Sequence, residues 1–335
     1  MNLGSAPVKL GAYAGGLAVV FAAAFAVGDV IDPITTPTSS AASHQTGAMP
    51  REDDLNGHDS STPAPGDGHG AHAAARATPA GLAVSERGYT LTPASATLPA
   101  GTRVPFAFTI TGPDGAPVRD FTLSHEKELH LIVVRRDLAG FQHVHPVRDA
   151  AGTWAVPLNL ADAGTYRVFA DFAPTALGGD GLTLGTDVAV AGRFTPAPLP
   201  APATTAAVDG YEVRMDGSPL AGRESDLTFT VSRDGEQLTD LQPYLGAYGH
   251  LVSLRGGDLA YLHTHPTQEA HAGQRGGPRV SFATTFPTDG TYRLFLDFQH
   301  AGKVRTAAFT VTVGASAPAA NTRATPAHDA TPHGH

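Results

Sequence analysis

The chain has 335 residues, 41% of them hydrophobic, which suits two domains of ordinary size with packed cores. Its net charge of −9 argues against a nucleic-acid-binding surface, because phosphate binding needs clustered Lys and Arg. The absence of Cys excludes disulfides, thiolate metal sites and a lipid anchor on cysteine.

An uncharged apolar segment occupies residues 10–28, after a short stub, residues 1–9, that carries Lys9. A run of this length just spans a bilayer as a helix, and the single cation before it favours a cytoplasmic N-terminus. The alternative is a secretory signal peptide with AFA at residues 24–26 as its cleavage site. We expect a single-pass protein of the cell membrane with extracellular C-terminal domains or, in the alternative, a secreted protein.

Two segments have the composition of disordered chain. Residues 29–80 and the tail, residues 315–335, are rich in Pro, Gly, Ser and Ala and show no apolar periodicity. Both carry histidines that either capture metal loosely or are simply solvated: His44, His58, His69, His72, His328, His333 and His335.

Between these segments the chain repeats itself. GYTL and GTYRVFADF of the first repeat match GYEV and GTYRLFLDF of the second. The repeats predict domain 1 over residues 81–194 and domain 2 over residues 207–314, joined by a Pro-rich linker over residues 195–206.

The repeats predict an all-β fold. Apolar residues alternate along the stretches 104–110 and 227–231, and Asp-Gly pairs between such runs indicate tight hairpin turns. The tyrosine after the Asp/Gly corner in DAGTYRVF and TDGTYRLF is typical of the tyrosine corner. We therefore expect two tandem immunoglobulin-like β-sandwich domains, with Trp154 in the core.

Each domain carries the same histidine-bearing hairpin. HLIVVRRDLAGFQHVHP occupies residues 130–146, and HLVSLRGGDLAYLHTHP occupies residues 250–266. In both, a His, an apolar run and a turn precede His-x-His-Pro at the same spacing. The predicted metal ligands are His130, His143, His145, His250, His263 and His265.

The register of each hairpin decides whether these histidines meet. An even loop centred between Asp137 and Leu138 places His130 opposite His145, with His143 on the same face. The equivalent register pairs His250 with His265 beside His263. An odd loop would separate the rings, and in the alternative reading the imidazoles bond only backbone groups.

Imidazole ligands without thiolates favour copper(II) or zinc, and the Irving–Williams order favours copper. Glu126 and Glu128 precede His130 and are candidates to orient its ring. Asp171 and Asp297 hold matched places and are expected to end strands, with a role in a site as the alternative. The remaining histidines of the two domains are expected to lie at the surface without binding metal: His125, His271 and His300.

The stretches EKELHLIVVRRDLAGFQHVHP and PYLGAYGHLVSLRGGDLAYLHTHP resemble those of exported or membrane-anchored, largely uncharacterised heavy-metal-binding-type proteins of high-GC Gram-positive bacteria. The domains are also distantly similar to small exported sandwiches of the YtkA, FixH and CopC kinds, several of which are linked to copper. CopC-type proteins use an N-terminal histidine ligand that has no counterpart here, so their mechanism does not transfer.

Motifs for catalysis are missing: the chain has no G-x-S-x-G elbow, H-E-x-x-H motif or glycine-rich phosphate loop, so we do not expect an enzyme. The expected function is extracytoplasmic binding, buffering or delivery of copper(II) or zinc. The alternative is a structural or protein-interaction module of the cell envelope. Expected partners are a metal ion, the membrane through the N-terminal helix, and an envelope protein.

Overall fold

The computed structural model describes residues 79–315, without the side chains of His263 and His265. The predicted stub, the anchor at 10–28 and nearly all of the predicted tether and tail lie outside the described residues. Within residues 79–315, no helix has the length and apolar character needed to cross a membrane. The one helical element among them is a single 3-10 turn, η1 (Thr175–Leu177).

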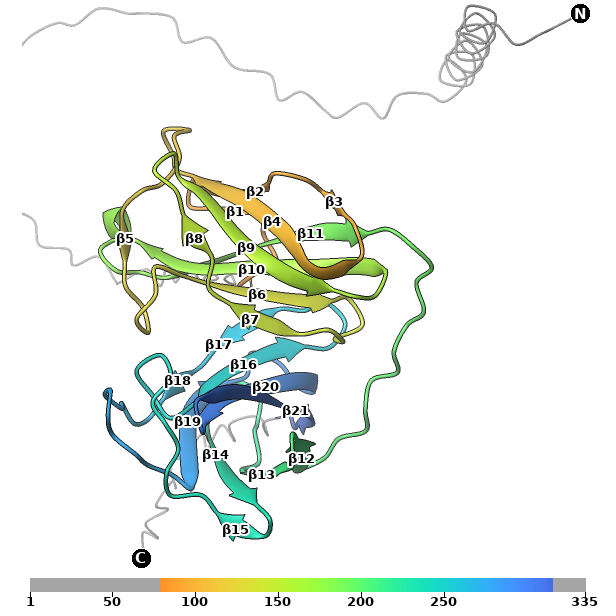
Figure 1. Cartoon of the computed structure of the whole chain (residues 1–335), viewed down its shortest axis with the longest axis vertical. Helices are drawn as coiled ribbons and strands as arrows, with labels where there is room; N and C mark the ends of the chain where they lie inside the picture. The colour runs from red at the N-terminus through yellow and green to blue at the C-terminus, as the bar shows by residue number, and fades with distance from the viewer. Residues whose placement is uncertain (1–78, 316–335) are drawn as a thin grey trace, which may run out of the picture. The chain divides into compact units, whose positions relative to one another are not determined.

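The described chain is all-β: four sheets form two tandem immunoglobulin-like β-sandwich domains, as the repeats predict (Figure 1). In the first sandwich, one sheet has the strand order β1-β2-β4-β9-β8 and the other β3-β11-β10-β6-β7, with β5 paired to β10. These strands are β1 (Ser85–Glu86), β2 (Tyr89–Pro93), β3 (Thr97–Leu98), β4 (Gly101–Thr111), β5 (Phe121–Thr122), β6 (Leu129–Arg135), β7 (Gln142–Val144), β8 (Val147–Arg148), β9 (Thr153–Leu160), β10 (Gly164–Pro174) and β11 (Leu182–Val190).

The second sandwich repeats this plan with sheets β12-β13-β14-β19-β18 and β17-β16-β20-β21, and β15 pairs with β14. Its strands are β12 (Thr205–Val208), β13 (Tyr211–Asp216), β14 (Glu224–Arg233), β15 (Glu236–Gln237), β16 (His250–Arg255), β17 (Tyr261–His263), β18 (His265–Pro266), β19 (Arg279–Thr285), β20 (Gly290–His300) and β21 (Lys303–Val313).

Alternating apolar residues build each sandwich core. Phe106, Phe108 and Ile110 of β4 are buried, and Trp154 of β9 stacks on Phe108 with ring centroids 6.3 Å apart. The tyrosine corner is present in both domains: the Tyr166 hydroxyl donates to the Asp162 carbonyl at 2.9 Å, and Tyr292 makes the same bond to Thr288 at 3.0 Å.

A third apolar cluster joins the two sandwiches, which belong to one compact unit of the chain. Ile132 and Val134 of β6 meet Val252 and Leu254 of β16 in this cluster. The stacked rings of Phe141 and Phe295 lie in it, with centroids 3.9 Å apart. All seven residues of β6 are buried, because one face packs inside its sandwich and the other packs against the second.

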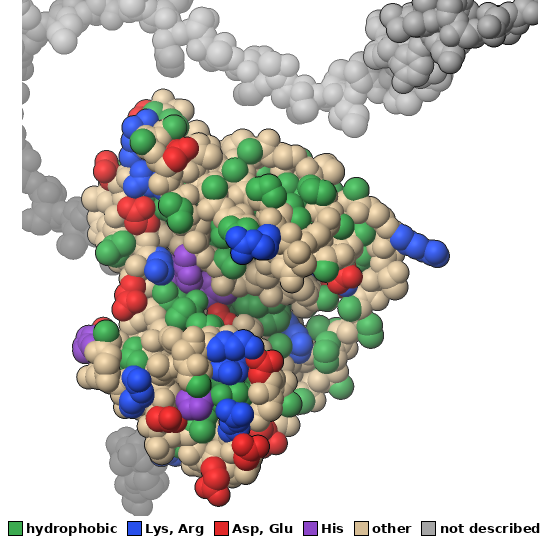
Figure 2. Space-filling view, viewed as in Figure 1, with side chains coloured by type: hydrophobic (Ala, Val, Ile, Leu, Met, Phe, Trp, Pro, Cys, Tyr) green, Lys and Arg blue, Asp and Glu red, His purple; other side chains and the backbone are tan. Residues whose placement is uncertain are grey.

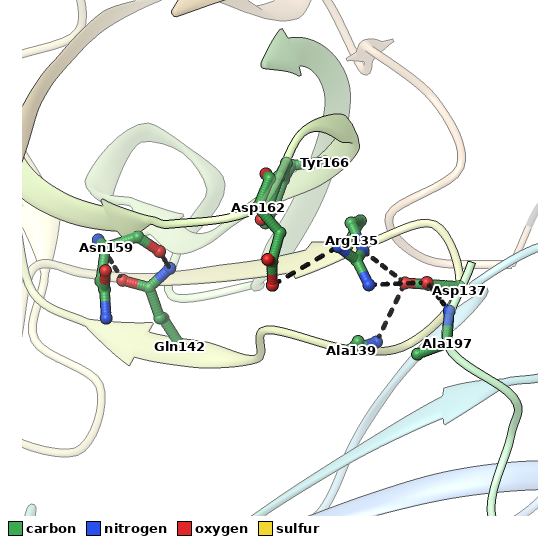
Figure 3. A network of polar contacts seen from close by, with 8 residues as sticks. All are labelled: Arg135, Asp137, Ala139, Gln142, Asn159, Asp162, Tyr166 and Ala197. Atoms are coloured by element: carbon green, nitrogen blue, oxygen red, sulfur yellow. Dashed lines mark hydrogen bonds and ion pairs between the residues drawn. The ribbon is translucent and has the colours of Figure 1, made fainter. Parts of the chain in front are cut away.

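The turn between β6 and β7 is fixed by a carboxylate (Figure 3). Asp137 accepts hydrogen bonds from Arg135 at 2.8 and 2.9 Å and from the backbone N–H groups of Ala139 and Ala197 at 3.3 and 2.7 Å. The second domain repeats the device with Arg255 and Asp258, which bonds the Ala260 N–H at 3.1 Å. Each hairpin is therefore held at its turn by an Arg–Asp pair.

The two hairpins have the even-loop register. In the first, Leu131 pairs with Val144 and Ile132 with His143. In the second, Val252 pairs with His263, the equivalent position. The predicted register, on which the convergence of the histidines depends, is confirmed in both domains.

Candidate metal centre

Three histidines of the first domain converge at the end of the β6–β7 hairpin. His130 Nδ1 lies 3.1 Å from His143 Nε2 and 3.2 Å from His145 Nε2. One ligand atom from each residue lies within 4.8 Å of the others. The three ring centroids are 5.0–5.3 Å apart. We call His130, His143 and His145 the triad.

The outer ring nitrogens of two triad members are engaged by groups that only accept hydrogen bonds. His130 Nε2 donates to the Ser124 carbonyl at 2.9 Å, and His143 Nδ1 donates to the Asp297 carboxylate at 2.8 Å. In a neutral imidazole, one nitrogen donates and the other carries a lone pair. The lone pairs of His130 Nδ1 and His143 Nε2 therefore face each other across 3.1 Å.

Two lone pairs at this distance repel unless a cation or a proton lies between them. Tetrahedral zinc with Zn–N bonds of about 2.0–2.1 Å separates its nitrogen ligands by about 3.3 Å. The observed separations of 3.1 and 3.2 Å are close to that value. Histidines that ligate metals also donate their other N–H to a carbonyl or a carboxylate. The triad fits a transition-metal ion in spacing, tautomer and outer contacts.

Burial keeps two rings of the triad, those of His130 and His145, neutral. It lowers the pKa of His130 to about 4 and that of His145 to about 3, and the nearby His143 adds to both shifts. Around neutral pH both rings are unprotonated, so metal binding does not first have to remove a proton from them.

The second sandwich contributes His250, at the start of β16. Its ring centroid lies 5.8 Å from that of His130 and 5.9 Å from that of His143. Burial lowers the pKa of His250 to about 2, with His143 and His125 next in effect. One predicted ligand of the second hairpin, His250, therefore lies beside the histidines of the first hairpin.

Asp171 and Asp297 correct the expectation that they only end strands. Each lies within a long strand, β10 or β20, and each is buried. Asp297 accepts from His143 of the other sandwich, and Asp171 accepts from the Tyr261 hydroxyl of the other sandwich at 3.1 Å. Desolvation, followed by the charge of Asp171, raises the pKa of Tyr261 well above its usual range. The two carboxylates therefore link the domains.

His125 corrects a second expectation. It is half-buried, and its ring lies 4.7 Å from that of His250 and 6.1 Å from that of His130, so it is part of the histidine cluster. The sequence reasoning missed it because the repeat places Leu245 at the equivalent position.

The other residues named from the sequence lie as follows. Glu128 pairs with Arg148 at 3.2 Å and Glu126 is exposed, so the carboxylate that orients a triad ring is Asp297. His271 is exposed, and His300 bonds Tyr211 and Asp240. The structure does not describe the side chains of His263 and His265, so their role as metal ligands stays a prediction.

The triad is accessible from one side. His145 lines a groove of about 330 Å³, together with Leu123, Glu126, Lys127 and Val147. Figure 2 shows histidine side chains in purple reaching the surface at a hollow, beside hydrophobic side chains in green. An ion held by the triad could therefore exchange with solvent or with a partner.

Several solved structures are similar to the chain. The Escherichia coli adhesin FdeC is 13% identical over 70% of this chain and 66% of that chain, with a TM-score of 0.23. Yersinia pseudotuberculosis InvD is 16% identical over 72% and 62%, with a TM-score of 0.22. The D0–D1 domain of intimin is 9% identical over 67% and 97%, with a TM-score of 0.20. The chain spans less than two thirds of FdeC and of InvD.

No curated protein sequence matches the chain. One family model matches twice, over residues 83–191 and 206–315, and so covers both sandwiches. The chain therefore belongs to the family described as Domain of unknown function (DUF8832), and it carries two copies of that domain.

Proposed function

We propose that this protein binds a copper(II) or zinc ion with His130 Nδ1, His143 Nε2 and His145 Nε2, outside the cytoplasm, for buffering or delivery. The observation that carries the proposal is the 3.1 Å separation of His130 Nδ1 and His143 Nε2, while the other ring nitrogens of these two residues contact the Ser124 carbonyl and the Asp297 carboxylate. Imidazole nitrogens suit both metals, and a nitrogen-rich site favours copper in the Irving–Williams order.

The accessible position of His145 supports reversible binding. A structural zinc site is closed by four protein ligands, whereas the triad supplies three and borders a surface groove. The rim of that groove carries the exposed side chains of Leu123 and Val147. This apolar rim suits a protein partner that collects or supplies the ion.

The extracytoplasmic location is part of the proposal and rests on the apolar segment at residues 10–28. Fractionation of cells that produce the full chain tests it. Recovery with the membrane supports the anchor, and recovery from the medium with an N-terminus just after residues 24–26 supports the cleaved signal. A chain found only in the cytoplasm would contradict both.

Calorimetric titration of the full chain with copper(II) and with zinc tests the metal site. Removing a residue that only hydrogen-bonds a metal ligand lowers metal affinity by about 10–100-fold. Removing a ligand itself should cost more, so we expect His143→Ala and His145→Ala each to lower the affinity for the most tightly bound ion by more than about 100-fold. His271→Ala is the matched control, because His271 is exposed and outside the triad. Unchanged affinity in both triad variants would contradict the metal site and favour the alternative of a protein-interaction module. A proton between His130 Nδ1 and His143 Nε2 would then explain their short separation.

A further inference from the structure

A small cavity is lined by two members of the triad, His130 and His143, and not by His145. Its lining includes four imidazoles and a carboxylate from both sandwiches: His125, His130, His143, His250 and Asp171. Its volume is about 10 Å³, close to the least volume that holds a single water molecule. A space of this size with this lining suits a single small cation.

Two of these imidazoles do not belong to the triad and face each other across the domain boundary. The rings of His125 and His250 have centroids 4.7 Å apart and are nearly perpendicular, at 89°. Two imidazoles on one ion, with metal–nitrogen bonds of about 2 Å, place their ring centres roughly 4.5–5.2 Å apart. The His125–His250 pair therefore has the spacing of two ligands of one ion.

The backbone determines where both rings lie. Ser124 and Lys127 exchange backbone hydrogen bonds of 2.9 and 3.0 Å, which close a two-residue turn with His125 and Glu126 at positive φ. The ring of His250 is anchored by its Nε2–H, which donates to the Leu245 carbonyl at 3.3 Å. Its Nδ1 consequently carries the lone pair, as in a metal-ligating tautomer.

The local charge also suits more than one cation. Asp171 and Asp297 are 8% and 2% exposed, and both contact the histidine cluster or its cavity. Both carboxylates accept hydrogen bonds from protein side chains, and their negative charges would offset part of the charge of two divalent ions.

We propose that His125 and His250 bind a second transition-metal ion at this cavity, next to the triad ion, so that a two-ion centre spans both sandwiches. The inference rests on the proposed function of the triad. The His130 and His250 rings, one from each ligand set, are stacked with centroids 5.8 Å apart, so the two ions are neighbours. Loading both ions would thereby tie the domains together.

Electron paramagnetic resonance of the full chain loaded with copper(II) tests this inference. Two neighbouring copper(II) ions couple magnetically and give a half-field signal, which isolated ions on the tether histidines do not. We expect this signal in the natural chain and its loss in His125→Leu. Leucine is chosen because Leu245 occupies the equivalent position in the second repeat. His145→Ala should also abolish it, by removing the triad ion, and His271→Ala should retain it.

The titrations separate the two proposals. In His125→Leu, we expect the tightest ion to remain with its affinity within about threefold of the natural chain, while one further equivalent is lost. No half-field signal in the natural chain at any loading, or an unchanged signal in His125→Leu, would overturn the second ion and leave the triad standing. Unaltered tight binding in both His143→Ala and His145→Ala would instead overturn the triad itself.

Discussion

The hydrogen bond between His143 and Asp297 connects residues 154 positions apart, one in each sandwich. Asp297 also accepts from the Thr306 hydroxyl of the neighbouring strand, which leaves the carboxylate little freedom to turn away from the ring. It therefore fixes the tautomer of His143 and makes Nε2 a better ligand.

Asp297→Ala should weaken metal binding by about 10–100-fold without removing a ligand atom, because the ring loses its orienting acceptor. The control is Asp240→Ala, which removes the carboxylate beside His300 Nε2 and should leave metal affinity unchanged. Titration calorimetry of both variants gives the comparison. Equal affinities in Asp297→Ala and the natural chain would refute the role assigned to this carboxylate.

The lowered pKa values make the metal-free chain sensitive to acid. His130 and His250 titrate in the folded chain at about 4 and about 2, against 6.5 in the unfolded chain, so below pH 6.5 the unfolded chain binds more protons. The free energy of unfolding should therefore fall as the pH drops from 6.5 toward 4, by up to about 1.4 kcal/mol per pH unit for each group.

Urea denaturation of the metal-free chain between pH 8 and pH 5 measures this dependence. His250→Leu should remove the contribution of one group from the slope, and the exposed His271→Leu should change nothing. A free energy of unfolding that stays constant over this range would contradict the neutral, buried state of these rings.

At the scale of elements, the β6–β7 hairpin sets the position of His143 and His145 relative to His130. Asp137 holds its turn, and Gln142 at the start of β7 exchanges hydrogen bonds of 2.8 and 2.7 Å with the backbone of Asn159 in β9 (Figure 3). Because side chains alternate between the faces of a strand, a slip of one residue would turn His143 away from His130.

Asp137→Ala should lower the free energy of unfolding by about 3 kcal/mol, because it leaves the buried Arg135 only its longer ion pair with the exposed Asp162 carboxylate, at 3.5 Å. It should also weaken metal binding by loosening the hairpin. Asp258→Ala is the matched variant in the second domain, where the carboxylate is 42% exposed, and should cost less than about 1 kcal/mol. Similar decreases in the free energy of unfolding in the two variants would contradict the larger contribution assigned to Asp137.

At the scale of the whole molecule, the two sandwiches share an apolar cluster with the histidine cluster beside it. Phe295 of the second sandwich is 3% exposed and stacks on Phe141 of the first. This burial couples the two cores, so we expect the described domains to unfold together in one calorimetric transition.

Phe295→Ala should cost about 3–5 kcal/mol and divide the thermal unfolding into two transitions, because it removes the stacked ring that joins the domains. Phe309→Ala is the control: it also removes a buried Phe, but one inside the core of the second sandwich, and should destabilise the chain without uncoupling the domains. Differential scanning calorimetry distinguishes the two results. A single transition in Phe295→Ala would show that the domains stay coupled without this ring and would contradict the role assigned to it.

The sequence alone determined the repeat, the all-β domains and the tyrosine corners, and it offered the even-loop register and the converging histidines as one of two possibilities. All of these depend on short-range spacing: alternation marks strands, and the length of a hairpin loop decides which residues face each other. His130, His143 and His145 lie on one hairpin, so their convergence follows from its register.

Tertiary structure alone decided that His250 of the second hairpin lies beside the triad, with Asp297, Asp171 and His125 around it. Those contacts depend on which faces of two sandwiches pack together, and no local spacing encodes that choice. A partial signal was present: β6 is apolar on both faces, which indicates a strand covered on both sides. The residues that cover the outer face came from the other domain, and only the folded chain shows which they are.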